Sequence, residues 1–377
     1  MKKIKINNQE SDLANDHQCS GIERNKAKDH SKIYSPYKIL KFRDRIEELQ
    51  QGKKTRPIKV NIRLHGLCNA DCSFCHCEMA PDAGGGRVKE DSAPRERDLG
   101  TGQGRRGLEF RTEPLLQFFE DFASLGGESV VLTGGEPTIH PDFEIIIAKM
   151  NELGLKWGMY TNALLIDRYY DSLKTATWIR VSLDPIFFRS KQKLLPKIRS
   201  LSDHGVFVSG SIIICRTANK SITAAQLPDV IEELKKNDIK ILRVSPDHYL
   251  RQIEKRDLAV QLKKLKKDNK DINIILQGEK YEANNLPIGK PCHYAEFQFR
   301  LDCSGFVFPC PSPILGTGTG KYAYGNLYEQ SFLEIWENVN PKFVINKDCE
   351  RFCIHSKKVK LLDYLMDNSG VGHDEFI

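Results

Sequence analysis

The sequence predicts an α/β protein with a parallel sheet or barrel, followed by a smaller C-terminal domain. Strand-like and helix-like segments alternate from about residue 57 to 277, and five cysteines then appear among short strands and turns. Alternating strands and helices form βαβ units, in which the strands are parallel. Six strand-like segments are fewer than the eight of a complete barrel. We therefore expect a partial (β/α)6 TIM-type barrel.

The six strand-like segments are short runs rich in β-branched and aromatic residues. In order, they are Val60–Leu64, Ser129–Thr133, Trp157–Thr161, Trp178–Asp184, Val206–Ile214 and Ile239–Val244. Helix-like segments at 113–125 and 141–153 separate the first three strands. The stretch Tyr34–Gln51 places its apolar residues near one face of a helix. We expect three regions: a polar, basic leader with a helical segment at 1–56, the barrel at 57–277 and a small domain at 278–377.

The composition is that of an ordinary globular protein, with 40% hydrophobic and 28% charged residues among 377, which excludes wholesale disorder and fibrous repeats. No apolar run approaches the roughly 20 residues that span a bilayer. The N-terminus is basic but lacks the apolar segment of a secretory signal. We expect a cytoplasmic protein without a membrane partner. In a reducing compartment its 11 cysteines are better explained as metal ligands than as disulfides.

Two segments stand apart from the barrel pattern. Residues 1–58 carry a net charge of +6 and the rest of the chain only +1. This pattern indicates a solvated leader and makes a nucleic-acid partner unlikely. Residues 80–111 form a long connection that is rich in glycine and arginine. Such a connection is usually functional or disordered, so it is either a lid at the barrel mouth or flexible filler.

The strongest chemical signal is the spacing of Cys68, Cys72 and Cys75 directly after the first strand. Three thiolates at this spacing can surround one compact metal centre, whereas structural zinc or a closed 4Fe-4S cluster takes a fourth ligand. Cys77 lies too close to Cys75 to turn back to the same centre. The motif therefore predicts either a cluster with one iron open to a substrate or cofactor, or a structural zinc site.

Gly134, Gly135, Glu136 and Pro137 follow the second strand, where the glycines permit close backbone approach. Together, the cysteine motif and this Gly-Gly-Glu-Pro motif resemble the radical S-adenosylmethionine (SAM) superfamily over about residues 57–250. The resemblance implies that Cys68, Cys72 and Cys75 hold a SAM-binding 4Fe-4S cluster, with SAM chelating the fourth iron. It further implies reductive cleavage of SAM to a 5′-deoxyadenosyl radical, which abstracts a hydrogen atom from the substrate.

The same resemblance implies the residues that contact SAM. Phe74 matches the aromatic residue that contacts adenine, and the ends of the third and fourth strands match other SAM-binding positions. The cofactor-binding residues implied in this way are Phe74, Gly134, Gly135, Glu136, Thr161, Asn162, Ser182 and Asp184. The stretch Gly210–Ile213 matches the family's adenine motif only in part.

The C-terminal cysteines resemble the auxiliary-cluster extension of radical SAM enzymes, in its shortened twitch rather than full SPASM form. The resemblance implies that a second 4Fe-4S cluster is ligated by Cys292, Cys310, Cys349 and Cys353. A four-thiolate zinc site is the alternative, and Cys303 could replace one of the ligands. Cys215 closes the fifth strand. In some radical SAM epimerases a cysteine returns a hydrogen atom to the substrate radical, but a buried cysteine is also an ordinary core residue.

Three functions remain open. The first is epimerisation, oxidation or rearrangement of a small metabolite such as a sugar, nucleoside or natural-product intermediate, because the leader is too short and irregular for a peptide-recognition domain. The nucleotide-acting branch that makes the molybdopterin precursor is a variant of this function, although its C-terminal Gly-Gly tail is missing here. The second function is maturation of a ribosomally made peptide, by a crosslink, thioether or epimer. In both cases the resemblance implies a reductant such as flavodoxin or ferredoxin.

The third function is a non-enzymatic zinc or iron–sulfur protein that binds nucleic acid through its basic leader.

Overall fold

The computed structural model describes residues 35–70, 72, 74–75, 86–87, 109–189, 191–215, 221–247, 250–276, 286–310, 322–339, 343–346, 349, 353 and 355–366. Residues 36–377 form one compact unit. Most of the predicted leader and most of the predicted lid lie outside the described residues, as do Cys19, His76 and Cys77. No helix in the described parts of the chain is both long and apolar enough to cross a membrane.

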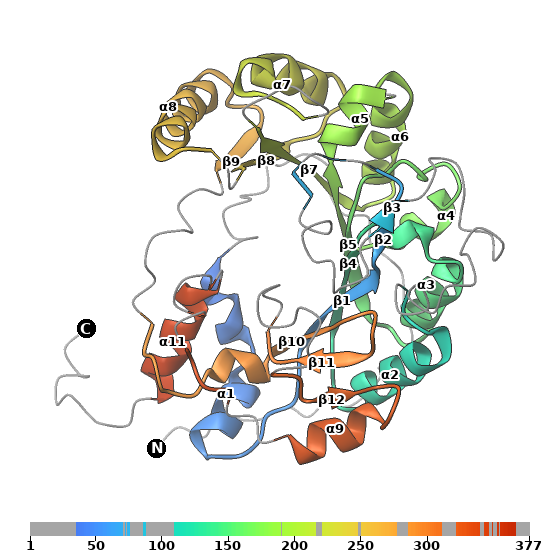
Figure 1. The fold of residues 1–377 in the computed structure, drawn as a ribbon, viewed down its shortest axis with the longest axis vertical. Coiled ribbons are helices and arrows are strands. Elements are labelled where there is room, and N and C mark those ends of the chain that lie inside the picture. Colours follow the sequence, from blue (N-terminus) through green and yellow to red (C-terminus); the bar gives the residue numbers. More distant parts are fainter. Residues whose placement is uncertain are drawn as a thin grey trace, which may run out of the picture. The chain divides into compact units, whose positions relative to one another are not determined.

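A ten-stranded sheet organises this unit (Figure 1). From edge to edge it runs β12 (Gly325–Asn326), β11 (Phe306–Phe308), β10 (Gln298–Leu301), β1 (Lys59–His65), β4 (Ser129–Gly134), β5 (Lys156–Thr161), β6 (Trp178–Ser182), β7 (Phe207–Ile214), β8 (Ile241–Pro246) and β9 (Asn273–Leu276). Every pair from β10 to β9 is parallel, whereas β11 and β12 are antiparallel additions. All six predicted strands are confirmed. The fourth ends at Ser182, earlier than expected.

Helices connect the parallel strands and lie along one side of the sheet (Figure 1). They are α2 (Thr112–Ser124), α3 (Phe143–Glu152), α4 (Tyr170–Leu173), α5 (Leu183–Arg189), α6 (Lys191–Asp203), α7 (Leu227–Lys236) and α8 (Gln252–Asp268), with 3-10 turns η5 (Pro137–Ile139) and η6 (Ala224–Gln226). The predicted N-terminal helix consists of the 3-10 helix η2 (Pro36–Lys41) and α1 (Arg43–Gln50), separated at Phe42.

The two faces of the sheet differ in chemistry. On the face that packs against the helices, alternate residues are fully buried and apolar, as Val60, Ile62 and Leu64 of β1 show. The residues between them point to the other side, because successive strand residues alternate between faces. We call that other side the inner face. It carries Lys59, Arg63 and the residues in register with them on neighbouring strands.

The C-terminal segment extends the same sheet. Strand β10 pairs in parallel with β1, with Lys59 opposite Gln298, although it follows β1 by more than 200 residues. Helix α9 (Phe332–Asn338) packs beside it, with the Phe332 ring centroid 4.9 Å from that of Phe118 and 5.1 Å from that of Phe299. The 3-10 helix η8 (His293–Glu296) and α11 (Ser356–Met366) complete the region. The C-terminal cysteines are thereby held on a scaffold that is continuous with the barrel strands.

Candidate active site

The loop after β1 positions the first three predicted ligands. It begins with the short strand β2 (Leu67–Cys68), which pairs in parallel with β3 (Gly86–Arg87). The Cys68 sulfur accepts the backbone N–H of Ala70 at 3.3 Å, and the N–H of Cys75 donates to the carbonyl of Cys72 at 3.2 Å. The second bond closes a turn that keeps Cys72 and Cys75 close in space.

The electrostatics of this loop suit a metal centre. Burial, together with the negative charges of Glu136 and Cys75, raises the pKa of the Cys68 thiol to about 12. Bound iron supplies the positive charge that such buried thiols need in order to ionise. The donor set therefore fits an iron–sulfur cluster held by Cys68, Cys72 and Cys75. Among the described residues, no three His, Cys, Asp or Glu side chains are arranged around a single metal ion.

The two glycines of the second motif lie directly against the cluster loop. The N–H of Gly135 donates to the carbonyl of His65 at 2.7 Å, and that of Glu136 donates to the carbonyl of Leu67 at 2.8 Å. A Cβ atom added at Gly135 would lie 1.9 Å from the Leu67 carbonyl oxygen, and one at Gly134 would lie 2.3 Å from that of His65. Only glycine permits this approach, so the end of β4 and the loop form one structural unit.

Glu136 is buried and uses both carboxylate oxygens within the protein. One oxygen accepts the Thr138 N–H at 3.1 Å and the hydroxyls of Thr138 and Thr161, both at 2.7 Å. The other oxygen accepts the N–H of Asn162 at 2.7 Å. Burial raises the pKa of Glu136, whereas these hydrogen bonds lower it. The carboxylate therefore ties the end of β4 to the end of β5.

Asn162 connects this carboxylate to the cluster loop. Its side-chain amide donates to the Cys68 sulfur at 3.6 Å and to the Asn69 side-chain oxygen at 2.7 Å. The structure thus brings Cys68, Glu136, Thr161 and Asn162 into one hydrogen-bonded group. The sequence analysis did not identify Asn69, although its place directly after Cys68 was a signal.

The remaining predicted cofactor-binding residues lie along the same edge, because the carboxyl ends of parallel strands meet there. Ser182, at the end of β6, is partly buried, as is Phe74 in the cluster loop. The Asp184 carboxylate accepts the N–H groups of Ile213 at 3.4 Å and Ile222 at 3.2 Å. Burial raises the pKa of Asp184 to about 7. Like Glu136, Asp184 joins neighbouring strand ends.

Cys215 directly follows β7 and is 7% exposed. Its sulfur lies 3.8 Å from the Ile213 carbonyl oxygen, and its N–H donates to the Ile222 carbonyl at 3.2 Å. Burial raises the pKa of the Cys215 thiol to about 11, and the charges of Asp247 and Asp184 add to the shift. The side chain is therefore a neutral thiol at physiological pH, the form that carries a transferable hydrogen.

The four predicted auxiliary ligands interact electrostatically. Burial raises the pKa of Cys292, and the negative charges of Cys310, Cys353 and Cys349 raise it further. The N–H of Cys353 donates to the Cys349 carbonyl at 2.8 Å. Cys303 differs, because the charge that raises the pKa of its buried thiol is that of Asp302, whose carboxylate lies 3.8 Å from the sulfur. These charge effects link Cys292 with the other three predicted ligands, which stay a prediction.

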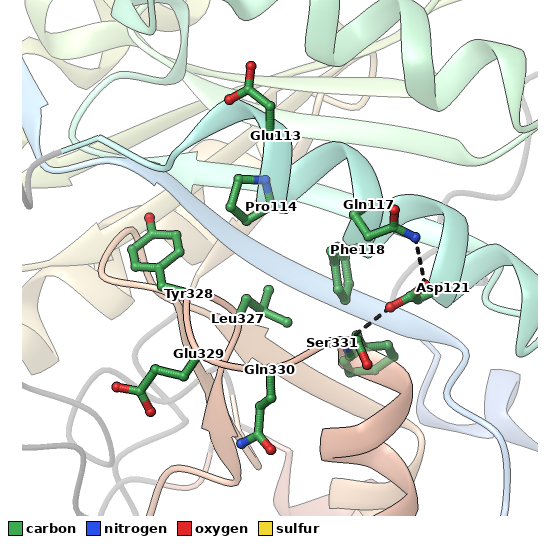
Figure 2. Close-up of a pocket in the computed structure, with 11 residues that line it drawn as sticks. Glu113, Pro114, Gln117, Phe118, Asp121, Leu327, Tyr328, Glu329, Gln330 and Ser331 are labelled. Atoms are coloured by element: carbon green, nitrogen blue, oxygen red, sulfur yellow. Dashed lines mark hydrogen bonds between the residues drawn. The ribbon is translucent and has the colours of Figure 1, made fainter.

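A cavity of about 490 Å³ lies between α2 and the segment that leads into α9 (Figure 2). Its walls contain none of the predicted site residues. Asp121 accepts the side-chain amide of Gln117 at 3.0 Å and the N–H of Phe332 at 3.1 Å. Asp121 thereby binds the first turn of α9 to α2. The cavity therefore lies where α2 packs against the segment before α9, and it contains no predicted ligand of either cluster.

Comparison with known proteins agrees with the two cysteine sets. Residues 62–201 match the radical SAM superfamily, and residues 292–353 match an iron–sulfur cluster-binding domain. These domains bind a 4Fe-4S cluster with SAM and an auxiliary iron–sulfur cluster, respectively. The first match covers Cys68, Cys72 and Cys75, and the second begins at Cys292 and ends at Cys353.

Named relatives are similar over part of the chain. The GTP 3′,8-cyclase of Aquifex aeolicus is 32% identical over 156 residues, which are 40% of this chain and 43% of that protein. The S-adenosylmethionine-dependent nucleotide dehydratase of Flammeovirga pacifica is 27% identical over 143 residues, which are 37% and 43%. The chain thus aligns with less than half of the length of either relative.

The fold is also that of a solved structure. The crystal structure of Streptococcus suis SuiB bound to S-adenosylmethionine matches 86% of this chain and 78% of its own, with a TM-score of 0.54 and 16% identity. This likeness supports the expected α/β fold with its mostly parallel sheet. Together, the sequence matches and the fold show that the chain contains a radical SAM domain at residues 62–201 and an iron–sulfur cluster-binding domain at residues 292–353.

Proposed function

We propose that this protein is an enzyme that cleaves SAM reductively and abstracts a hydrogen atom from a small metabolite. The observation that carries this proposal is the hydrogen-bonded group of Cys68, Asn162 and Glu136. It joins the cluster loop to the ends of β4 and β5. The site would operate in the cytoplasm with a one-electron donor such as flavodoxin or ferredoxin.

The protein's own residues would hold and shield the reacting groups. Cys68, Cys72 and Cys75 would ligate the first cluster, which together with SAM supplies a 5′-deoxyadenosyl radical. Cys292, Cys310, Cys349 and Cys353 would ligate the auxiliary cluster. Glu136 and Asp184 fix the strand ends around the site, because each accepts N–H groups from a neighbouring segment. Such rigidity gives selectivity, since a primary carbon radical attacks the C–H bond held nearest to it.

SAM cleavage is the first test. After anaerobic reconstitution with iron and sulfide, the protein should form 5′-deoxyadenosine in the presence of a strong reductant. Cys72→Ala should abolish this product. Cys77→Ala, a control in the same loop, should retain it. Product formation by Cys72→Ala at the wild-type rate would contradict the ligand assignment, and a zinc protein without SAM cleavage would contradict the proposal.

Cys215 is the proposed hydrogen donor if the reaction is an epimerisation. Its S–H would give a hydrogen atom to the substrate radical, and the thiyl radical left behind would take one electron and one proton through the external reductant. Its position directly after β7, at the edge where the strand ends meet, supports this role, and burial raises the pKa of Cys215 so that the hydrogen stays on sulfur. In D2O, the wild-type product should gain one deuterium, and Cys215→Ala should form no labelled product. Labelled product from Cys215→Ala would exclude this thiol as donor.

A small, nucleotide-like metabolite is favoured over a peptide as substrate. The relatives described above are named for reactions of GTP and of nucleotides, although they align with only part of this chain. Incubation of the reconstituted enzyme with nucleotides and with peptides encoded nearby would separate the two classes. The true substrate should increase 5′-deoxyadenosine formation and yield a product of altered mass or retention. A response to a peptide alone would favour peptide maturation.

A further inference from the structure

Lys358 places an ammonium group beside the predicted ligands of the auxiliary cluster. It lies in the first turn of α11, five residues after Cys353. Its Nζ atom donates to the Tyr294 hydroxyl at 3.0 Å and lies 5.0 Å from the centre of the Tyr294 ring. The Tyr294 hydroxyl donates in turn to the Gln298 side-chain oxygen at 2.6 Å. These contacts hold the ammonium group in one position.

Tyr294 connects this ammonium group to the ligand set. The residue follows Cys292 by two positions and is buried. It belongs to an apolar group against which Cys292, Cys349 and Cys353 pack. Its ring centroid lies 4.8 Å from that of His355, which follows Cys353 by two positions. Burial raises the pKa of Tyr294, and the negative charges of three of the ligand cysteines act in the same direction. One side chain therefore separates Lys358 from the ligands.

Among the residues that the structure describes, no carboxylate forms an ion pair with Lys358. Its hydrogen-bond partner is the neutral Tyr294 hydroxyl. The charges that act on it are positive, because burial and the charge of Lys38 together lower the pKa of Lys358. Burial and the positive charges of Lys358, Arg180 and Lys38 likewise lower the pKa of Lys59 to about 8. Cations close enough to repel one another cost free energy unless an anion lies nearby.

The auxiliary cluster would supply this anion. A 4Fe-4S cluster with four cysteine thiolates carries net negative charge, and reduction adds one more electron. A nearby ammonium group therefore stabilises the reduced cluster more than the oxidised one. Because Lys358 is partly buried, water screens its charge less than that of a lysine on the surface.

We propose that Lys358, positioned by Tyr294, is the counter-charge of the auxiliary cluster and raises its reduction potential. A higher potential makes this cluster a better acceptor of one electron. In an oxidation, the substrate radical would lose one electron to the cluster and one proton to the solvent. This inference rests on the proposed function and on the four proposed ligands of the auxiliary cluster.

The test is a redox titration of the anaerobically reconstituted holoenzyme with dithionite, followed by electron paramagnetic resonance with and without SAM. The auxiliary cluster is the one whose signal SAM leaves unchanged. Lys358→Met should lower the midpoint potential of this cluster. We expect a shift of about tenfold in the reduction equilibrium, or about 59 mV for one electron. This is the effect of one charge about 10 Å away at an effective dielectric constant of about 20.

Three further variants separate charge from packing. Lys358→Arg keeps the charge and should keep a potential close to that of wild type. Tyr294→Phe removes the hydroxyl that holds the ammonium group, and should give a smaller shift in the same direction as Lys358→Met. Lys357→Met is the matched control, because Lys357 is exposed on the same helix, and it should leave the potential unchanged.

The inference is wrong if Lys358→Met keeps both the iron content and the auxiliary potential of wild type, or if Lys357→Met lowers that potential equally. It is also wrong if Lys358→Arg lowers the potential as much as Lys358→Met does, because packing would then be the cause. If Lys358→Met loses the auxiliary cluster, Tyr294→Phe decides, and an unchanged potential in that variant contradicts the inference. 5′-Deoxyadenosine formation without substrate depends on the first cluster and reports separately on the proposed function.

Discussion

Gly135→Ala should separate the cluster loop from the end of β4. The added Cβ atom would lie 1.9 Å from the Leu67 carbonyl oxygen and 2.4 Å from its carbonyl carbon. Both neighbours are backbone atoms, so no side-chain rotation can relieve the overlap. The hydrogen bonds from Gly135 to His65 and from Glu136 to Leu67 cross the same contact. Any movement that accommodates the methyl group lengthens both bonds.

The expected cost follows from these contacts. Overpacking a tight site costs about 1–3 kcal/mol, and each weakened hydrogen bond adds about 1 kcal/mol. The total cost of about 3–5 kcal/mol destabilises the native conformation of the loop that carries Cys68. Since about 1.4 kcal/mol changes an equilibrium tenfold, we expect the first cluster to be lost and 5′-deoxyadenosine formation to fall about 100-fold or more. The auxiliary cluster should stay, so bound iron should fall to about half.

Iron and sulfide analysis, together with the rate of 5′-deoxyadenosine formation, tests this expectation. Gly154→Ala is the matched control, because Gly154 has φ +68° but nothing within 4 Å of an added Cβ atom. That change should cost only the strain of a left-handed residue, about 1–2 kcal/mol, and should keep both clusters. The reasoning is refuted if Gly135→Ala binds as much iron as wild type and forms 5′-deoxyadenosine within a factor of two of its rate.

Three further changes probe other contacts. Asn162→Ala removes a donor to the Cys68 sulfur and should slow SAM cleavage about 10-fold without loss of iron; an unchanged rate would show that the bond is dispensable. Burial holds the pKa of Asp184 at about 7, well above its unfolded value. Only the folded state is therefore protonated between about pH 4 and 7, and this carboxyl should lower the unfolding free energy as pH rises through that range. Denaturant unfolding from pH 5 to 7 should show a loss of roughly 1 kcal/mol per pH unit relative to Asp184→Asn, and parallel profiles would contradict the assignment. Asp121→Ala should destabilise the fold by about 1–2 kcal/mol, because the first turn of α9 loses its acceptor; Glu113→Ala, also at the cavity but exposed, should change the melting temperature little, and equal effects would contradict this role.

Local patterns were sufficient to predict the six strands Val60–Leu64 to Ile239–Val244. Each strand is a short run of β-branched and aromatic residues bounded by turn residues, and that signal depends only on near neighbours. The cysteine and glycine motifs were likewise readable, because each lies within one short segment directly after a strand. The contact between Gly135 and Leu67 explains in physical terms why the two motifs occur together.

Contacts between segments that lie far apart in the sequence could not be predicted from the sequence. Strand β10 is four residues long and lies among cysteines that indicate a different domain, and nothing local shows that it pairs with β1. The orientation of Glu136 also escaped prediction, because its partners Thr161 and Asn162 belong to the next strand. Only the tertiary structure shows that this carboxylate connects the end of β4 to the end of β5 by hydrogen bonds.

The alternation within the strands carries information that the strand prediction did not use. Parallel strands packed on both faces are usually continuous apolar runs, and barrel interiors are usually filled with branched apolar side chains. Here Arg180, Arg243 and Arg300 each interrupt an apolar strand at a position that faces inward. A buried charge at such a position costs stability unless a partner compensates it. The strand prediction, which rests on β-branched and aromatic residues, therefore identifies the strands but not which of their residues face the interior.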